Sequence, residues 1–227
     1  NNELGRIRSF NWVTGIYRFV REVDLERDYT WFEVPYVSKF DVSRSALYGQ
    51  GTFSLSDRLS FSTGLRFESH DSKFIDSFDV RFSPQDSLLG GKAVLEMLAN
   101  ENSRFHASIS KGYKSGGFNT SGSLDEPLRL FEPEILWNIE LGWIVEFEKS
   151  DASLRALLFK MDRSDVQIST SIVRVREDGS SEFVEFTGNA AEGVNQGLEL
   201  EYAQRVNDFA LIRASLGLLN SRYSGYN

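Results

Sequence analysis

The residues best suited to bind a ligand lie in a glycine-rich segment, residues 111–119, and at the far end of the connection that follows it. Lysine, arginine and aromatic side chains together suit an anionic ligand, because cations pair with its charge and rings contact its flat or apolar parts. The segment lacks the Gly-x-x-x-x-Gly-Lys-Ser/Thr order of a phosphate-binding loop, so we expect a loop entered from a strand. The candidate ligand contacts are Lys111, Tyr113, Lys114, Phe118, Arg129 and Phe131.

Histidine and cysteine give little support for a metal centre. The sequence holds two histidines, His70 and His106, and no cysteine. Zinc and related ions need three or four such ligands at defined spacing, so we expect no metal site and no resident cofactor. We expect His70 at the end of a strand and His106 on a hydrated strand face.

Two pairs of carboxylates stand two residues apart, at Glu146 and Glu148 and at Glu199 and Glu201. Glycosidases place two carboxyl groups about 5–9 Å apart, a separation that this spacing within a strand allows. Carboxylates recur on the polar side of several expected strands, however, so a hydrated surface explains the pairs more simply. The sequence also lacks a nucleophile-elbow motif. We therefore expect no catalytic residue and no enzyme.

The overall charge and hydrophobicity exclude several classes of protein. The 227 residues contain 25 Lys and Arg against 33 Asp and Glu, a net charge of −8. A nucleic-acid-binding protein normally carries a clustered basic excess, so we expect no nucleic-acid partner. No apolar run reaches the roughly 18 residues of a transmembrane helix. Phenylalanine is abundant, with 18 copies against 4 of proline, which favours strands.

Alternation of apolar and polar residues predicts an all-β protein. In residues 134–148 the odd positions are apolar and the even positions are mostly polar. At a period of two the apolar residues share one face of a strand, whereas at helical spacing they would not. The same pattern elsewhere predicts about nine long strands. We place them at 6–21, 47–55, 58–68, 88–98, 103–110, 134–148, 152–161, 197–202 and 209–219.

Short and long connections are expected to alternate along the chain. Short turns rich in Asn, Asp and Ser are expected at 56–57, 100–102, 149–151 and 206–208. Long connections are expected at 22–44, 69–87, 112–133, 163–190 and from 220 onward, the fourth with its own hairpin around Asp178-Gly179. A soluble sandwich has no reason to alternate in this way, whereas an outer-membrane barrel has short periplasmic turns and long extracellular loops. We therefore predict an antiparallel meander that forms part of a large transmembrane β-barrel.

The tryptophans allow a different interpretation, a platform that stacks on sugar rings. Trp137 and Trp143 share one strand face and are separated by about 20 Å of rise. That separation is typical of aromatic girdles at the two interfaces of a membrane barrel. We therefore favour girdles over a sugar platform for these residues and for Trp12 and Trp31.

Four stretches, taken in order, resemble TonB-dependent outer-membrane receptors. Residues 111–119, Lys-Gly-Tyr-Lys-Ser-Gly-Gly-Phe-Asn, resemble a strand-to-loop segment of that family, and residues 131–142, Phe-Glu-Pro-Glu-Ile-Leu-Trp-Asn-Ile-Glu-Leu-Gly, resemble its next strand. Residues 189–201 resemble its later Asn…Gly-Leu-Glu-Leu-Glu strand, and residues 46–68 follow its hairpin pattern. Within the family the likeness is greatest to receptors for ferric siderophores.

The resemblance implies a 22-stranded barrel with a plugged lumen in the bacterial outer membrane. It implies active uptake of a ferric siderophore or a similar scarce nutrient, with the protein's own plug domain, the TonB complex and outer-membrane lipid as partners. The candidate contacts named above would then lie near the extracellular mouth. We expect residues 1–227 to be a partial barrel domain, without the plug domain or the closing C-terminal strand, and to be an internal segment of a longer protein.

Two other functions stay open at this point. A soluble β-sandwich that binds carbohydrate would require a second sheet over the apolar face of residues 135–147. An outer-membrane enzyme of the lipase type would require a serine close to one of the two histidines.

Overall fold

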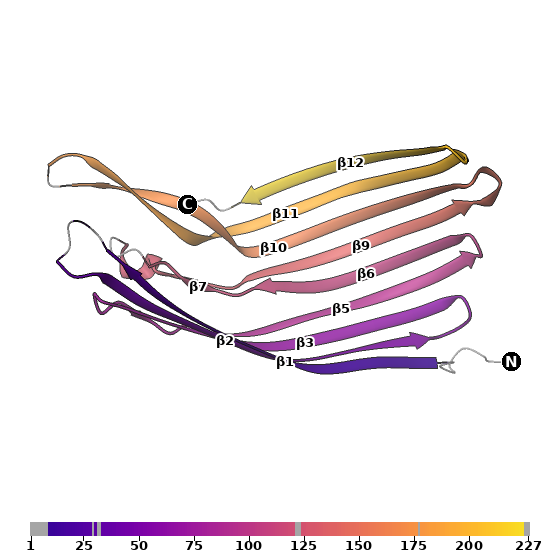
Figure 1. Cartoon of the computed structure of the whole chain (residues 1–227). Coiled ribbons are helices and arrows are strands. Elements are labelled where there is room, and N and C mark those ends of the chain that lie inside the picture. Colours follow the sequence, from indigo (N-terminus) through magenta and orange to yellow (C-terminus); the bar gives the residue numbers. More distant parts are fainter. Residues whose placement is uncertain (1–8, 29, 31–32, 121–123, 177, 225–227) are drawn as a thin grey trace.

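The computed structural model describes residues 9–28, 30, 33–120, 124–176 and 178–224, and only the backbone of residues 190 and 191. Trp31 and residues 6–8, which were included in the predictions above, lie outside the described residues. Nine long strands form among the described residues (Figure 1). They are β1 (Ser9–Arg27), β2 (Tyr36–Ser54), β3 (Leu59–Asp76), β5 (Gln85–Asn100), β6 (Ser103–Lys114), β9 (Glu134–Phe147), β10 (Ala152–Val175), β11 (Ser181–Asn207) and β12 (Ala210–Ser224). The short elements are β4 (Arg81–Phe82), β7 (Gly117–Phe118), the 3-10 turn η1 (Glu126–Leu128), β8 (Leu130–Phe131) and the 3-10 turn η2 (Glu148–Ser150).

The long strands form one antiparallel meander, in the order β1-β2-β3-β5-β6-β9-β10-β11-β12. Figure 1 shows them side by side in a single curved wall, with the short turns gathered at one end and two long arms, β1–β3 and β10–β11, at the other. The predicted all-β meander and its short turns are therefore confirmed. No helix among the described residues is long and apolar enough to cross a membrane.

One face of the wall, which we call the outer face, carries the apolar stripe and is uncovered. Trp137, Ile139 and Leu141 of β9 are 46%, 48% and 55% exposed. Across the strands the apolar residues stand opposite one another, as Leu141 does to Leu158 of β10. Among the described residues no second sheet lies over this face, because the remaining sheet is the β7–β8 pair alone. The β-sandwich alternative is therefore not supported.

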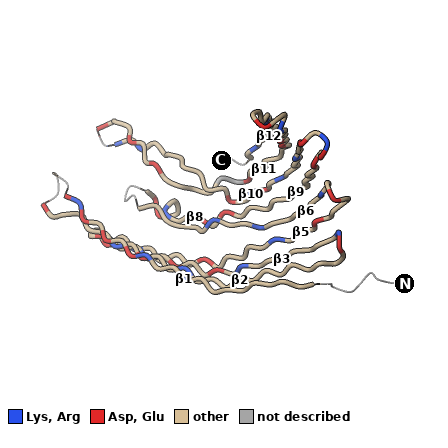
Figure 2. The backbone as a smooth tube through the Cα atoms, turned by 45° about the vertical axis from the view of Figure 1, so that its right-hand side comes forward, with Lys and Arg blue, Asp and Glu red and all other residues tan. Residues whose placement is uncertain are grey.

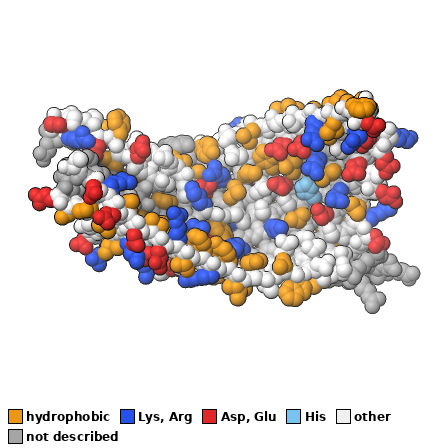
Figure 3. Space-filling view, viewed as in Figure 1, with side chains coloured by type: hydrophobic (Ala, Val, Ile, Leu, Met, Phe, Trp, Pro, Cys, Tyr) orange, Lys and Arg blue, Asp and Glu red, His pale blue; other side chains and the backbone are white. Residues whose placement is uncertain are grey.

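The opposite, inner face is buried in the half of the wall remote from the short turns. In β3, Glu68, His70, Ser72 and Phe74 are buried, while the residues between them point outward. Charged residues of both signs lie at the short turns and along the arms (Figure 2), and Figure 3 shows their side chains on one face of the molecule. The inner face of the arms therefore contains the most enclosed part of the described chain.

The predicted bounds of the long connections are mostly wrong, because the strands continue through much of each range. β2 begins at Tyr36, β3 reaches Asp76 and β12 reaches Ser224. In the last part of β3 the backbone stays paired with β2, but the outward residues Ser69, Asp71 and Lys73 are polar. The alternation of apolar and polar residues therefore ends before the strand does. The connection of residues 115–133 is the one that stays long.

The hairpin predicted around Asp178 and Gly179 is present, but it is the end of β10 and β11 rather than a separate unit. Val175 pairs with Ser181, and Gly179 adopts φ +82°, a value that suits glycine. The hydroxyl of Ser180, and then its backbone N–H, donate to the Asp178 carboxylate and hold the pKa of Asp178 below its usual range. A polar, solvated turn thus closes the longest arm.

Two smaller predictions also need correction. His70 lies well inside β3 and is buried, not at a strand end, because β3 continues for six residues beyond it. Glu148 belongs to η2, so it does not share a strand face with Glu146. His106 does lie within β6, opposite Gly142 of β9.

Several glycines of the sheet lie under a side chain from a neighbouring strand. A Cβ built at Gly142 would fall 1.8 Å from the His106 ring, and one at Gly197 would fall 2.7 Å from the ring of Phe159. A glycine has no side chain to pack on the surface of a sheet. An aromatic or imidazole ring from the neighbouring strand fills that space and supplies the missing packing contact. The glycine positions are therefore fixed by cross-strand packing.

Candidate functional site

The long connection between β6 and β9, residues 115–133, lies between the two arms of the wall (Figure 1). Within it Gly117 pairs with Phe131 and Phe118 with Leu130, which makes a small hairpin of β7 and β8. We call residues 115–133 the inner loop, because its contacts are with the inner face. Leu124, at its tip, is 2% exposed. The described residues of the loop, 115–120 and 124–133, are thus packed into the structure.

On one side the inner loop is anchored by Phe118. Its ring lies 5.5 Å from the Phe40 ring of β2, 5.2 Å from Phe74 of β3 and 5.2 Å from Phe82 of β4, centroid to centroid. Close-packed rings of this kind contribute both apolar burial and edge or stacking contacts. The anchor therefore binds the loop to the β1–β3 arm.

On the other side the inner loop is hydrogen-bonded to β11. The side-chain amide of Asn119 donates through Nδ2 to the carbonyl oxygen of Thr187 over 2.8 Å, and the Thr187 N–H donates to Asn119 Oδ1 over 2.8 Å. The backbone N–H of Glu132 donates to Asn189 Oδ1, and Asn189 Nδ2 donates back to the Glu132 carbonyl. Each asparagine replaces a missing strand neighbour, so the loop bridges the two arms.

A buried carboxylate holds the base of the inner loop. Glu134, at the start of β9, is 7% exposed, and its carboxylate accepts two hydrogen bonds from the Arg163 guanidinium. The backbone N–H of Gln167 donates to its other oxygen over 3.0 Å, and Gln167 Nε2 donates to the Ser115 carbonyl. Because two guanidinium N–H groups donate to Oε1 and a backbone N–H donates to Oε2, burial of the Glu134 charge is compensated.

Below the loop, the inner face has a hollow of about 580 Å³ with a glycine floor. Gly64, Gly90 and Gly112 lie on the floor, and the walls include Tyr48, Arg66, Lys92, Ser110, Tyr113 and Asn138. Arg66 donates to the buried Glu68 carboxylate and to the Tyr113 hydroxyl, which also donates to Glu68. The arrangement offers hydroxyl, amide and cationic groups to a polar occupant.

The structure distributes the predicted contact residues over three places. Tyr113 reaches the inner-face hollow, and Phe118 is the anchor of the inner loop. Arg129 donates from Nε to the Leu124 carbonyl inside the loop, while Phe131 packs over Gly117. Lys114 is exposed at the end of β6.

Lys111 lies on the outer face instead. Its Nζ is 5.9 Å from the ring centroid of the exposed Trp137, its direct neighbour on β9. Sequence reasoning placed it beside Tyr113 because the two are near in sequence. It also missed Asn119, Asn189, Glu134 and Arg66, whose roles depend on partners from distant strands.

The comparisons with known proteins agree with this geometry. A family model described as "TonB dependent receptor-like, beta-barrel" matches residues 1–227. The chain belongs to this family. The resemblance inferred from the motifs is therefore confirmed, and the family is one of outer-membrane receptors and transporters rather than of enzymes.

Similar proteins include receptors of known structure. The chain is 26% identical over 208 residues to the pesticin receptor of Yersinia pestis, which covers 87% of this chain and 29% of that protein. It superimposes on the ferric yersiniabactin uptake receptor FyuA from Yersinia pestis with a TM-score of 0.70 and 21% identity, over 97% of this chain and 34% of that one. It superimposes on the copper transporter OprC with a TM-score of 0.73 and 16% identity, over 96% of this chain and 36% of that one. The two structures show the shared fold.

The chain spans about a third of the length of these relatives. FyuA is described as a ferric yersiniabactin uptake receptor and OprC as a copper transporter. At 21% and 16% identity the two structures show the fold and do not identify a ligand for this chain.

Proposed function

We propose that this chain is part of a receptor in the bacterial outer membrane that takes up ferric siderophores, or a similar scarce nutrient, by active transport. Family membership over the whole chain supports this, as do structural neighbours described as a ferric yersiniabactin uptake receptor, a ferric-catecholate import receptor and siderophore receptors. The structural observation that carries the proposal is the inner loop, held across the inner face by its own Asn119 and by Asn189 of β11. Its described residues give the receptor a packed surface at the end of the wall remote from the short turns.

We assign ligand contact to the side chains that the inner loop and its margins present. Lys114 supplies an exposed cation, and Phe131 and Tyr113 supply ring surfaces. Arg129 and Phe118 act mainly by shaping the loop, since both are engaged within it or against the wall. Cations beside rings suit a large anionic chelate with aromatic or flat parts. In this assignment Lys111 makes no ligand contact.

Transport itself requires the rest of the protein. We propose that the other strands complete the barrel, that a plug domain of the same protein occupies the inner face, and that the TonB complex supplies the energy for its rearrangement. An open wall of nine strands would leave unpaired backbone groups in lipid at β1 and β12, which is unfavourable. In this proposal, further strands of the protein pair with β1 and β12 and satisfy their backbone hydrogen-bonding groups.

The test is growth of a deletion strain on defined iron sources. We expect the strain to lose growth on one class of ferric chelate and to regain it when the intact gene is supplied. A gene carrying Lys114→Gln together with Phe131→Ala should restore growth poorly, although the receptor is present in the outer-membrane fraction at the normal level. Equal growth of the deletion strain on every ferric chelate tested, or a defect confined to another nutrient, would overturn the ferric assignment.

A further inference from the structure

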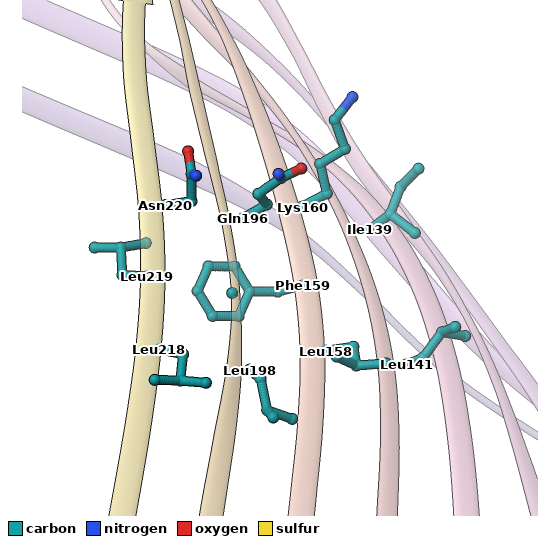
Figure 4. Close-up of a pocket in the computed structure, with 11 residues that line it drawn as sticks. Ile139, Leu141, Leu158, Phe159, Lys160, Gln196, Leu198, Leu218, Leu219 and Asn220 are labelled. Carbon is teal, nitrogen blue, oxygen red and sulfur yellow. The ribbon is translucent and has the colours of Figure 1, made fainter.

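Two titratable side chains, Glu68 and His70, are buried next to each other on the inner face of β3. The outer face differs, because its groove across β9, β10, β11 and β12 is lined mainly by apolar side chains (Figure 4). The cation of that groove, Lys160, is exposed and already paired with Asp162. A buried ionisable group depends on its neighbours more than an exposed one does. Protonation of His70 therefore has consequences for the groups packed around it.

His70 lies beyond the apolar part of β3. Phe67 is 55% exposed on the outer face, whereas the next outward residues, Ser69 and Asp71, are polar, so His70 lies outside the part of the strand proposed to meet hydrocarbon. His70 is 6% exposed, and its Nδ1 has no hydrogen-bond partner among the described residues. Burial first, and the Arg44 guanidinium second, hold the pKa of His70 below its ordinary value. The neutral imidazole is therefore the favoured form.

One oxygen atom lies between His70 and the inner loop. Strand register places Arg44 of β2 opposite His70, and His70 opposite Asp86 of β5. Asp86 Oδ2 is 3.9 Å from His70 Nδ1, too far for a hydrogen bond. The same oxygen accepts a hydrogen bond of 3.0 Å from the backbone N–H of Gly116. Asp86 thus attaches the beginning of the inner loop to β5, with a histidine beside the acceptor.

Two further carboxylates act on His70 from its own strand, Glu68 and Asp71. The Glu68 carboxylate already accepts from the Arg66 guanidinium and from the Tyr113 hydroxyl. Asp71 is an outward residue of β3, on the other side of the strand from the His70 side chain. Asp86 is therefore the carboxylate that a protonated His70 would engage.

Gly116 is packed tightly against the far end of the same loop. A Cβ built there would fall 2.5 Å from the carbonyl oxygen of Phe131 and 3.2 Å from the carbonyl carbon of Glu132. The two ends of the inner loop are thus in contact at this glycine. A change in the bond between Gly116 and Asp86 therefore affects Phe131 as well.

We propose that His70 and Asp86 make the attachment of the inner loop pH-dependent: when His70 takes up a proton from solvent, the Asp86 carboxylate turns toward the imidazolium and its bond with Gly116 weakens. A charge-assisted bond between nitrogen and oxygen is about 2.7–2.9 Å long, so Oδ2 must move by about 1 Å from its present position. A movement of that size disturbs a 3.0 Å hydrogen bond from Gly116.

The linkage between protonation and structure has the same sign. A histidine whose pKa is lowered by its packed surroundings stabilises them fully above the unfolded pKa of about 6.5. That stabilisation is lost as the pH falls from there toward the lower pKa. Acid is therefore expected to loosen the beginning of the inner loop, and neutral pH to hold it.

The consequence for uptake rests on the proposed function, because the inner loop follows Lys114 and carries Phe131, the assigned ligand contacts. Ligand contact would be better ordered at neutral than at acid pH. The pH-dependent attachment itself needs no ligand, and it is tested without one.

The test is hydrogen exchange of residues 115–120 in the intact receptor, in detergent and without any transported ligand, at about pH 7.5 and about pH 5.5. Wild type is compared with His70→Gln at each pH, so the intrinsic pH dependence of exchange cancels. We expect equal rates at the higher pH. At the lower pH wild type should exchange about fivefold faster, the effect of losing one hydrogen bond of about 1 kcal/mol. Asp86→Ala removes the acceptor and should exchange fast at both pH values.

His106→Gln is the matched control, because it makes the same change at the other histidine of the sequence, which lies on β6 over Gly142. It should keep the response of wild type. A ratio of wild type to His70→Gln that is the same at both pH values, slower exchange of wild type in acid, or loss of the response in His106→Gln would overturn the proposal.

A second comparison covers the case in which His70→Gln does not reach the outer-membrane fraction. The exchange rate of wild type relative to Asp86→Ala should then be about one fifth at the higher pH and near one at the lower pH. An unchanged ratio would count against the proposal in the same way. Failure of the proposed uptake function appears in the growth test alone and does not alter these rates.

Discussion

The side-chain amide of Asn119 and the backbone of Thr187 exchange two hydrogen bonds of 2.8 Å across 68 residues of sequence. Asn119 Nδ2 also donates to the Leu128 carbonyl over 2.9 Å, so both of its amide hydrogens and its oxygen are used. The amide therefore behaves as an extra strand residue that joins the inner loop to β11. Together with Asn189, which exchanges two hydrogen bonds with the backbone of Glu132, this side chain links the loop to the β10–β11 arm.

Asn119→Ala should weaken the attachment of the inner loop to β11 without unfolding the wall, because the Asn189–Glu132 pair remains. The change leaves the N–H and carbonyl of Thr187 without their partners, and each lost bond of this kind costs about 1 kcal/mol. We expect faster hydrogen exchange and faster proteolysis within residues 115–133 of the intact receptor, with little change in global melting. Asn195→Ala is the control, since Asn195 accepts one exposed hydrogen bond from Ser221 far from the loop. Equal protection of the loop in both variants would contradict this role.

Phe118→Ala should detach the other side of the inner loop. The ring fills a space between Phe40, Phe74 and Phe82, and removal of a packed ring costs about 3–5 kcal/mol when fully buried. Because Phe118 is half-buried, we expect about 2 kcal/mol, measured as a lower free energy of local opening by hydrogen exchange. Phe118→Leu, which retains apolar bulk, should lose less than half of that. A loop equally protected in both variants would show that the ring is not an anchor.

Gly142→Ala should destabilise the wall through His106. The new methyl group would lie within the His106 ring, which must leave its place, and such overpacking costs about 1–3 kcal/mol. His106→Ala removes the obstacle, so the double variant should be more stable than Gly142→Ala alone. Unfolding by denaturant of the intact receptor in detergent measures both. Additive losses in the double variant would rule out this packing relationship.

The sequence predicts the fold far better than the site, for a physical reason. The outer face must be apolar along every strand that meets lipid, so residues 134–148 and 58–68 reveal their alternation locally. The arms have no such requirement, and the strands there continue on polar residues that look like loop. The contacts of Asn119, Asn189 and Glu134 join segments far apart in sequence, and no local pattern encodes them.

The sequence also does not show on which face of the sheet each candidate ligand contact lies. Lys111 and Tyr113 are two residues apart in β6, and a regular strand would place them on one face. Instead Lys111 lies over Trp137 on the outer face, whereas the Tyr113 hydroxyl donates to Glu68 on the inner face. The pairing of β6 with β5 ends at Lys111, while its pairing with β9 continues to Lys114, so Tyr113 has no paired residue on β5. Composition alone cannot show where a ladder ends.

Glu134→Gln should loosen the base of the inner loop. The carboxylate accepts from the Arg163 guanidinium and from the Gln167 N–H, and an amide can satisfy only one of these with its single oxygen. We expect a loss of about 2–3 kcal/mol, because a buried partner is left unpaired. Glu132→Gln makes the same change of charge two residues earlier, at an exposed side chain, and should be neutral. Hydrogen exchange at Gln167 separates the two outcomes, and equal exchange would contradict the assignment.

A charge placed on the outer face should cost far more than the same charge on the inner face. Leu141 is 55% exposed on the outer face of β9, and Ser108 of β6 donates to Glu140 on the inner face. In a bilayer, Leu141→Lys puts an ammonium group into hydrocarbon, at a cost of about 2–4 kcal/mol near the midplane. Ser108→Lys puts the same group beside a carboxylate in a hydrated interior and should be nearly neutral. Reversible unfolding of the intact receptor from phospholipid vesicles measures both variants. If Ser108→Lys proves as costly as Leu141→Lys, the outer face does not meet lipid, and the orientation of the whole wall must be revised.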